Sequence, residues 1–303
     1  MSEPELQDAY PLTPAQQGIL SHCLRTADPT LYHSQVTFTL RGPLQTSELV
    51  GAWQRLVRSH DVLRTLFVWE DMDQPLQAVV RDVAVNAEVE DWSGQAQSFV
   101  DHAWQACLTA EMAQGFDLGA APLCRLKVRR IAPDELRVLW SYHHLILDGW
   151  SSQRLLSELL RLLDPAAEPQ PRRPFKEYVA WRRNLPDAPA QDFWRSELEG
   201  FSDVTRLSLR STMPADGAEA RFDRLWHALS ASQSAELAAF GRRHKLTTSS
   251  LISFAWAVVL SRVSRSSDVV FGITVAGRPP SLPGVNDSVG MYVNTLPVRV
   301  RLS

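Results

Sequence analysis

Two neighbouring histidines, His143 and His144, with Asp148 four residues after the second one, are the residues of this chain best suited to chemistry. A neutral imidazole accepts a proton, and a carboxylate acts as a base or fixes the position of a neighbouring group. Neighbouring side chains on a strand point to opposite faces, so we expect one histidine at a reaction site and the other packed or hydrogen-bonded behind it. Gly149 allows a sharp turn directly after Asp148.

The elements around this motif are predicted to be a strand and a helix. Residues 136–142 form an apolar run typical of a strand, and residues 151–163 carry leucines spaced along one helical face. The motif therefore lies where a strand ends and a helix begins, which is a common place to build a site on rigid supports.

Three other interpretations of the motif are weaker. Two packed core histidines would not require the following Asp148 and Gly149. A metal site on His144 and Asp148 lacks a third ligand nearby, so we predict no metal. A serine hydrolase using Ser151 would need a Gly-x-Ser-x-Gly turn, which the sequence lacks. The pattern favours direct transfer between two bound substrates, in which a histidine handles the proton.

Asp148 needs a partner, because a carboxylate near the end of a buried strand is costly without one. Arg64 and Arg278 are the candidates, since an arginine fork would hold both the carboxylate and the loop that carries it. We favour a structural ion pair over a second catalytic acid.

Composition excludes several classes of partner. The net charge of -3 over 303 residues does not favour nucleic acid or an anionic membrane. We expect no signal peptide and no membrane span, and therefore a cytoplasmic protein. Three cysteines, Cys23, Cys107 and Cys124, fit buried thiols in a reducing compartment better than a disulfide framework.

Strands and helices alternate along the chain, which predicts two α/β layers. A proline-rich stretch at 164–174 is the best linker, so we expect one lobe over 1–168 and a second over 169–303. Predicted strands are 35–40, 62–69, 76–80, 123–130, 136–142, 221–229, 269–275 and 291–302. Predicted helices begin near residue 13 and cover 46–60, 97–114, 151–163, 175–184, 190–198, 232–244 and 248–263.

Five segments spread along the chain form an ordered series of motifs. They are YPLTPAQQG (10–18), RSHDVLRTLF (58–67), SYHHLILDGWS (141–151, with HHxxxDG complete), RPFKEYVAW (173–181) and VGMYVNTLPVR (289–299). On these segments, which together cover essentially the whole chain, it resembles a condensation domain of a non-ribosomal peptide synthetase, in the chloramphenicol acetyltransferase superfamily. Asp61 stands where the family's second motif has glutamate.

This resemblance implies a V-shaped pair of lobes with a tunnel between them. It also implies that upstream and downstream carrier proteins present thioesters on 4'-phosphopantetheine arms, beside a neighbouring adenylation domain, with no cofactor bound by the domain itself. The acceptor amine attacks the donor thioester and forms a peptide bond. The opening motif and the residues after Asp148 look most like domains that join two L-residues. The family continues past Arg299, so the second lobe looks incomplete and the chain looks C-terminally truncated.

Within that family we expect His144 to face the tunnel and His143 the core, with Trp150, Ser151 and Asn294 as further tunnel candidates. His144 acts either as a general base or as a group that orients the amine. A backbone N–H near Gly149 is the candidate donor to the thioester oxygen. The rivals are a non-catalytic module that recruits carrier proteins, and a stand-alone acyltransferase of the same superfamily. The latter would carry an Asp-Phe-Gly-Trp-Gly motif, which the sequence lacks.

Overall fold

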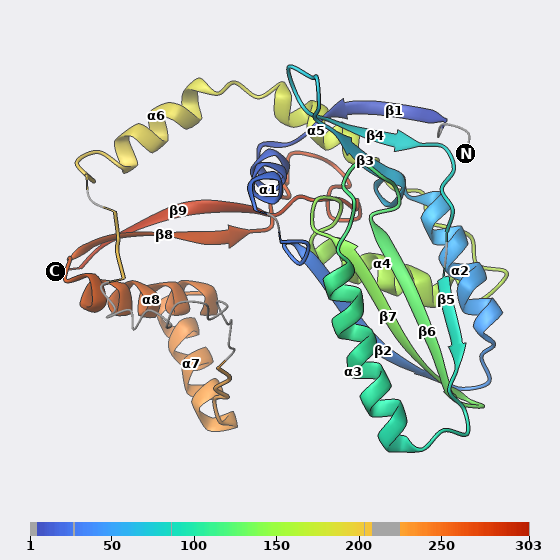
Figure 1. Ribbon diagram of the computed structural model, residues 1–303. Helices are drawn as coiled ribbons and strands as arrows, with labels where there is room; N and C mark the ends of the chain where they lie inside the picture. Colours follow the sequence, from blue (N-terminus) through green and yellow to red (C-terminus); the bar gives the residue numbers. More distant parts are fainter. Residues whose placement is uncertain (1–4, 27, 86, 203, 208–224, 303) are drawn as a thin grey trace, which may run out of the picture. The chain divides into compact units, whose positions relative to one another are not determined.

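The computed structural model describes residues 5–26, 28–85, 87–202, 204–207 and 225–302. It has the predicted α/β fold class, with strands and helices mixed along the chain (Figure 1). The chain divides into two compact units. Unit 1 is Met1–Leu185 with Ala276–Asn294, and unit 2 is Pro186–Val275 with Thr295–Ser303.

Unit 1 contains a larger and a smaller sheet with helices packed on them. Its elements are β1 Leu6–Pro11, α1 Pro14–Arg25, β2 His33–Arg41, α2 Thr46–Ser59, a 3-10 helix Asp61–Arg64, β3 Thr65–Val68, β4 Leu76–Val80, β5 Ala87–Asp91, α3 Gln97–Gln114, β6 Cys124–Ala132, β7 Glu135–His143, α4 Gly149–Arg161 and α5 Phe175–Arg183.

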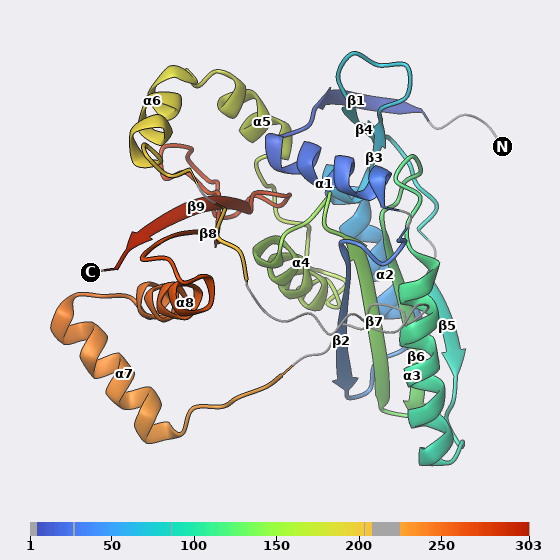
Figure 2. The same cartoon turned by 60° about the vertical axis from the view of Figure 1, so that its left-hand side comes forward.

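The larger sheet has the strand order β2-β7-β6-β5, antiparallel except for the parallel pair of β5 and β6. Its two faces follow from the alternation of side chains along β7. On one face Trp140 packs edge-on against Trp53 of α2, with ring centres 5.9 Å apart. On the other face Leu139 is buried with Trp104 of α3. Accordingly, α3 runs along this sheet in both views (Figure 1 and Figure 2).

Two strands of unit 1 were not predicted from sequence. β1 pairs with β4 in the smaller sheet, whose order is β1-β4-β3. β5 is rich in acidic residues, and Glu88 forms ion pairs with Arg129 and with Lys127 (3.1 Å) on the neighbouring β6. Strand pairing and cross-strand ion pairs replace an apolar pattern at this edge, so a search for alternating apolar residues does not find it. The strand expected over 62–69 begins instead as the 3-10 helix Asp61–Arg64.

The boundary between the units differs from the expected break at 168 and 169. The proline-rich stretch 164–174 stays attached to unit 1, because Arg172 pairs with buried Glu158 of α4 at 2.8 Å. Helix α5 follows it, and the ring of Phe175 packs against Tyr292, with centres 5.1 Å apart. Unit 1 therefore extends to Leu185 and also includes the returning segment 276–294. A long-range return of this kind leaves no local composition signal at the boundary.

Gly277, at the start of the returning segment, has a φ of +62°. A Cβ at this position would collide with the backbone carbonyl of Tyr292. Only glycine allows the two ends of this segment to approach so closely while keeping a left-handed conformation.

Unit 2 contains α6 Ala188–Glu197, α7 Ala231–His244, α8 Thr248–Ser264, β8 Asp268–Val275 and β9 Asn294–Arg301, with β8 and β9 forming a two-stranded sheet. Its small core joins Ala257 and Leu260 of α8 to Val269 of β8. Of the strand expected over 221–229, residues 221–224 lie outside the described part, and 225–229 have no regular structure. Several large apolar side chains of α8 are exposed, namely Ile252, Phe254, Trp256 and Val259.

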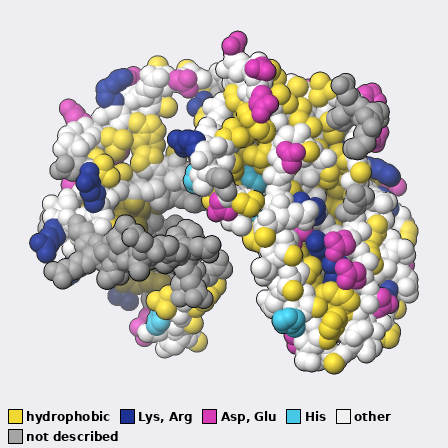
Figure 3. Space-filling view, viewed as in Figure 1, with side chains coloured by type: hydrophobic (Ala, Val, Ile, Leu, Met, Phe, Trp, Pro, Cys, Tyr) yellow, Lys and Arg dark blue, Asp and Glu magenta, His cyan; other side chains and the backbone are white. Residues whose placement is uncertain are grey.

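On the face shown in Figure 3, acidic and basic side chains of unit 1 are interspersed. This distribution agrees with the near-neutral net charge. Among the described residues, no single helix is both long and apolar enough to cross a membrane, and only α7 and α8 taken together, bent by 100°, meet the length and composition test.

Candidate functional site

The histidine motif lies where β7 passes into α4. β7 ends at His143, a turn covers residues 144–146, and α4 begins at Gly149, after Leu147 and Asp148. Asp148 is the N-cap of α4, since its Oδ1 accepts a hydrogen bond from the backbone N–H of Ser151 at 2.7 Å. The junction of strand and helix is thus the predicted one, and the carboxylate is used in part to cap the helix.

His144 is partly exposed, and both of its ring nitrogens have partners. Nδ1 lies 3.0 Å from the carbonyl oxygen of Leu147. A carbonyl only accepts hydrogen bonds, so in the neutral ring Nδ1 carries the hydrogen and Nε2 carries the lone pair. Nε2 lies 3.0 Å from Oγ of Ser34, whose hydroxyl can donate to it. The backbone N–H of His144 donates to the carbonyl of Tyr32 at 2.8 Å.

His143 is 3 % exposed and is held in the opposite tautomer. Its Nδ1 accepts from the backbone N–H of Leu145 at 3.1 Å, so the hydrogen lies on Nε2, which points to Sγ of Cys23 at 3.8 Å. Burial, followed by the neighbouring imidazoles of His144 and His33, lowers the pKa of His143 to about 4. The ring is therefore neutral at pH 7.

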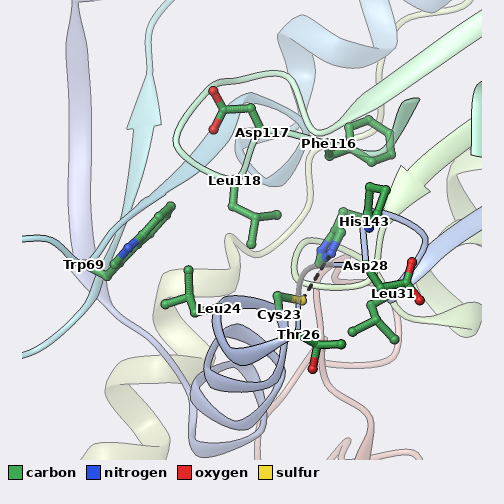
Figure 4. Close-up of a pocket in the computed structure, with 11 residues that line it drawn as sticks. Cys23, Leu24, Thr26, Asp28, Leu31, Trp69, Phe116, Asp117, Leu118 and His143 are labelled. Atoms are coloured by element: carbon green, nitrogen blue, oxygen red, sulfur yellow. Dashed lines mark hydrogen bonds between the residues drawn. The ribbon is translucent and has the colours of Figure 1, made fainter. Parts of the chain in front are cut away.

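The sequence predicts that His143 faces the core. The ring is buried, but it also forms part of the lining of a cavity of about 360 Å³ (Figure 4). The other lining residues come from the end of α1, the loop that precedes β2, the residue after β3 and the loop after α3. The ring of His143 therefore meets packed side chains on one part of its surface and the cavity on another.

Asp148 is 1 % exposed, and protein donors surround both of its oxygens. Oδ2 accepts from the backbone N–H groups of Tyr292 (3.1 Å) and Val293 (3.3 Å), both in the returning segment. Oδ1 lies 3.5 Å from the guanidinium of Arg278. A buried carboxylate with this set of donors stabilises the contact between the motif and the returning segment.

Arg278 links the motif to the returning segment. Its guanidinium is 3 % exposed and donates to Oγ of Ser151 and to the carbonyl of Ser288, both at 2.8 Å. It also donates to the carbonyl of Val285 and lies 4.0 Å from the ring centre of Tyr292. Arg278 thus connects Asp148 with the returning segment through one planar group.

Arg64, the other candidate partner of Asp148, is elsewhere. It pairs with Asp61 at 2.6 Å, and it donates to the carbonyl of Val80 at 2.5 Å. Asp61 and Arg64 are three residues apart on the 3-10 helix, so their ion pair is local. The contact of Arg64 with Val80 links this helix to β4 of the smaller sheet. The departure from the family's glutamate therefore keeps a carboxylate beside this arginine.

The structure separates the three further tunnel candidates. Ser151 is completely buried, and its Oγ exchanges hydrogen bonds with the carbonyl (2.8 Å) and N–H (3.0 Å) of Gly290, so it does not line an open channel. Trp150 is 48 % exposed, and its indole N–H donates to the carbonyl of Asn286 at 3.1 Å. Asn294 is exposed. Of the three, Trp150 and Asn294 are thus accessible to a substrate.

Sequence reasoning missed Ser34. In the register of β2 and β7, Ser34 lies directly opposite Tyr142, two residues before His144. Residues opposite each other and residues two apart share a face of the sheet, which puts Ser34 beside His144. No local pattern marks this serine, because the relation depends on strand register.

No group of three or more metal-ligating side chains occurs among the described residues. The N-terminus of α4 offers hydrogen-bond donors from its backbone instead. The backbone N–H groups of Gly149 and Trp150 have no hydrogen-bond partner in the described part of the chain. A Cβ added at Gly149 would meet no atom within 4 Å, so the approach to this end of the helix is open.

Comparisons with known proteins show which family this chain is similar to. A family model described as "Condensation domain" matches residues 6–303. One polypeptide of the linear gramicidin synthase of Brevibacillus parabrevis is 36 % identical over 308 residues, which is 98 % of this chain and 4 % of that protein. Surfactin synthase subunit 3 of Bacillus subtilis (strain 168) is 29 % identical, over 100 % of this chain and 24 % of that protein. The chain spans only a small part of these relatives.

Solved structures show the same fold. The SgcC5 protein from Streptomyces globisporus has a TM-score of 0.76 and 23 % identity, over 97 % of this chain and 69 % of that one. A four-domain nonribosomal peptide synthetase bound to AMP and glycine has a TM-score of 0.78 and 20 % identity, over 100 % of this chain and 23 % of that one.

The chain belongs to the condensation-domain family of non-ribosomal peptide synthetases. Condensation domains of these synthetases are acyltransferases that form amide bonds. The resemblance read from the five sequence motifs is therefore confirmed.

Proposed function

We propose that this chain joins a donor acyl thioester to the amine of an acceptor thioester, with both substrates carried on the phosphopantetheine arms of carrier proteins. The observation that carries the proposal is the pair of hydrogen bonds that orient His144. The Nδ1–H group donates to the carbonyl of Leu147, and the Nε2 lone pair faces the hydroxyl of Ser34. The ring itself is partly exposed.

The proposed reaction proceeds as follows. The acceptor amine attacks the thioester carbon, the carbon–sulfur bond breaks, the donor arm leaves as a thiol, and the amine loses one proton. The hydroxyl of Ser34 rotates away from Nε2 of His144, which then accepts that proton and passes it to the leaving sulfur, or holds the amine by a hydrogen bond. Proton transfer by a positioned base contributes about 10²–10⁴-fold. Holding both substrates in place contributes up to roughly 7–11 kcal/mol, so positioning supplies the larger share.

Negative charge develops on the thioester oxygen during attack. The unpartnered N–H groups of Gly149 and Trp150 at the start of α4 are the candidate donors to it. The Asp148 and Arg278 pair supports this end of the helix from behind, since both side chains are buried and turned to the returning segment.

We infer further that both substrates are L-residues, that the partners are upstream and downstream carrier proteins with an adenylation domain, and that the reaction takes place in the cytoplasm. The opening motif YPLTPAQQG and the residues after Asp148 support the stereochemical part. Three free thiols support a reducing compartment. A peptide-formation assay with L- and D-aminoacyl carriers tests the stereochemistry, and comparable rates with a D-donor would remove it.

The catalytic assignment is tested by His144→Ala in the polypeptide that carries this domain, with carrier proteins loaded chemically. We expect the rate of dipeptide formation to fall about 10²–10⁴-fold. His102→Ala, at an exposed position on α3, is the matched control and should leave the rate unchanged. Near-normal turnover in the His144 variant would exclude this role.

A further inference from the structure

The cavity beside His143 has the size and lining of a small-molecule site, and the reaction steps proposed above do not involve it. Its volume of about 360 Å³ falls in the range of small-molecule sites. Figure 4 shows Trp69 and His143 on opposite sides, with the side chains of Leu24 and Leu118 between them. The interior is thus predominantly apolar and aromatic.

The cavity lies on the other face of the sheet from the Nε2 atom of His144. His143 and His33 are directly opposite in the pairing of β7 and β2, and Ser34 pairs with Tyr142. Because neighbouring residues alternate between faces, the side of His143 differs from the side on which Ser34 meets His144. A ligand in this cavity would occupy the rear of the motif, next to the His143 ring and Cys23.

Charge selects the kind of ligand. Two carboxylates, Asp28 and Asp117, belong to the lining, and no lysine or arginine among the described residues does. Oδ1 of Asp28 accepts hydrogen bonds from the backbone N–H and the hydroxyl of Thr30. Oδ1 of Asp117 accepts one from the backbone N–H of Gly119. The second oxygen of each has no hydrogen-bond partner within the described ranges.

A guanidinium does lie next to the lining, but it is already paired. Arg125 is 4.0 Å from the ring centre of Phe116 and 2.6 Å from the fully buried carboxylate of Glu111. The field in the cavity is therefore set by the two carboxylates and the aromatic rings, which both attract cations.

We propose that this cavity is a binding site for a small apolar ammonium ion, with its hydrocarbon part between Trp69 and His143 and its charge in the field of the exposed carboxylates of Asp28 and Asp117. The site stands independently of the proposed catalysis, because its test needs neither carrier proteins nor turnover.

Titration calorimetry with 2-phenylethylamine and 3-phenylpropionate tests this proposal, since the two probes share a ring and a chain length and differ in charge. We expect the amine to bind at one site with a dissociation constant of about 1 mM, and the carboxylate to bind at least about tenfold more weakly. Equal binding of the two probes, or no binding of the amine, would overturn the proposal.

A pair of variants locates the binding. Leu24 lines the cavity from the exposed side and is itself 50 % exposed, so Leu24→Trp fills the space without disturbing the core. It should abolish amine binding, whereas Leu160→Trp, at a position on α4 that is 42 % exposed and outside the lining, should not. Binding that survives Leu24→Trp unchanged would place the amine elsewhere and refute the site.

The double variant Asp28→Asn/Asp117→Asn removes both charges and keeps the oxygens that accept from Thr30 and Gly119. We expect the amine to bind roughly fivefold more weakly, as loss of two exposed ion pairs predicts. Asp134→Asn, in the turn between β6 and β7, is the control. An unchanged affinity in the double variant would contradict recognition by charge.

Discussion

Two histidines that are neighbours in the chain are held in different tautomers by the backbone around them. The N–H of Leu145 fixes the lone pair of His143 on Nδ1, while the carbonyl of Leu147 fixes the hydrogen of His144 on Nδ1. The Nε2 of His143 consequently donates towards Cys23, and that of His144 accepts on the side of Ser34. At the residue scale, identical side chains acquire distinct chemistry from hydrogen bonds to the main chain.

Ser34 is expected to act through His144 as a positioning residue. Ser34→Ala removes the hydroxyl that meets Nε2, so the ring loses one of the two hydrogen bonds made by its nitrogens. We expect kcat for dipeptide formation to fall roughly 2–10-fold, as loss of one hydrogen bond of about 0.5–1.5 kcal/mol predicts, with little change in KM.

Ser34→Thr keeps a hydroxyl, and its branched Cβ suits the strand β2. This variant should restore most of kcat. A loss of kcat in the alanine variant that threonine does not restore, or a matching loss of thermal stability, would assign Ser34 a packing role instead.

Asp148→Asn is expected to act mainly through folding. The amide nitrogen of asparagine cannot accept from the N–H groups of Tyr292 and Val293, and Arg278 is left buried without its counter-ion. Breaking one side of a buried ion pair costs about 3–5 kcal/mol. Urea denaturation measures this loss as a lower unfolding midpoint.

Arg154→Met is a suitable control for the loss of stability in Asp148→Asn. Arg154 is 39 % exposed in its pair with Asp287, so its removal should change stability by less than about 1 kcal/mol. An Asp148→Asn protein with unchanged stability and no turnover would show instead that the carboxylate takes part in the chemistry.

At the scale of single elements, helix α4 contacts distant parts of unit 1 at both of its ends. Its N-terminus is capped by Asp148, and its last turns carry the buried Glu158. Glu158 accepts from His60, the residue after α2, at 3.2 Å, and from Arg172 in the proline-rich stretch at 2.8 Å. One helix therefore joins the histidine motif, α2 and the chain leading into α5.

This arrangement predicts a specific loss of stability in acid. Burial raises the pKa of Glu158, but hydrogen bonds and charge from His60 and Arg172 outweigh it and lower the pKa from 4.5 to about 2. A depressed pKa stabilises the fold above the unfolded value, and this contribution is lost as the pH falls. We expect up to about 3 kcal/mol of unfolding free energy to disappear between about pH 4.5 and pH 2.

Urea midpoints measured across that range, for the wild type and Glu158→Gln, test the assignment. The variant should be less stable at pH 7 and should show a flatter acid dependence. Glu177→Gln is the control, since Glu177 is 43 % exposed in its pair with Arg173 and should follow the wild-type curve. Parallel curves for Glu158→Gln and wild type would assign the acid dependence to other groups.

At the scale of the whole molecule, unit 1 is discontinuous in sequence. The segment 276–294 follows β8 of unit 2 and returns to supply Arg278, Tyr292 and Val293 to the buried end of the motif. The apolar side chains of Val289 and Met291 belong to the same core as β7 and α4. We infer that the returning segment folds and unfolds together with the first half of the chain.

Hydrogen exchange tests whether the returning segment and β7 form one cooperative unit. If they do, the amides of Tyr292 and Val293 should exchange with free energies within about 1 kcal/mol of those of Val138 and Trp140. The amide of Asp134, in the exposed turn between β6 and β7, sets the fast limit for comparison. Rapid exchange at Tyr292 and Val293 would show that the segment opens independently.

Much of the motif's setting follows from local sequence. The apolar run before His143 and the leucine spacing after Gly149 predicted the strand and helix that became β7 and α4. Helix α3 was predicted with its observed bounds, Gln97–Gln114. These features depend on side-chain periodicity and on capping and turn residues, which act over a few positions and can be read from the chain directly.

Contacts between distant segments required the tertiary structure. The choice of Arg278 over Arg64 as the partner of Asp148 depends on the return of 276–294, and the position of Ser34 depends on the register of β2 against β7. The cavity beside His143 depends on how separate segments pack around one ring. The sequence by itself determined the family, the motif and most elements, because these are local patterns. Only the tertiary structure decided which charges pair and what each imidazole meets, because packing brings together residues that no spacing relates.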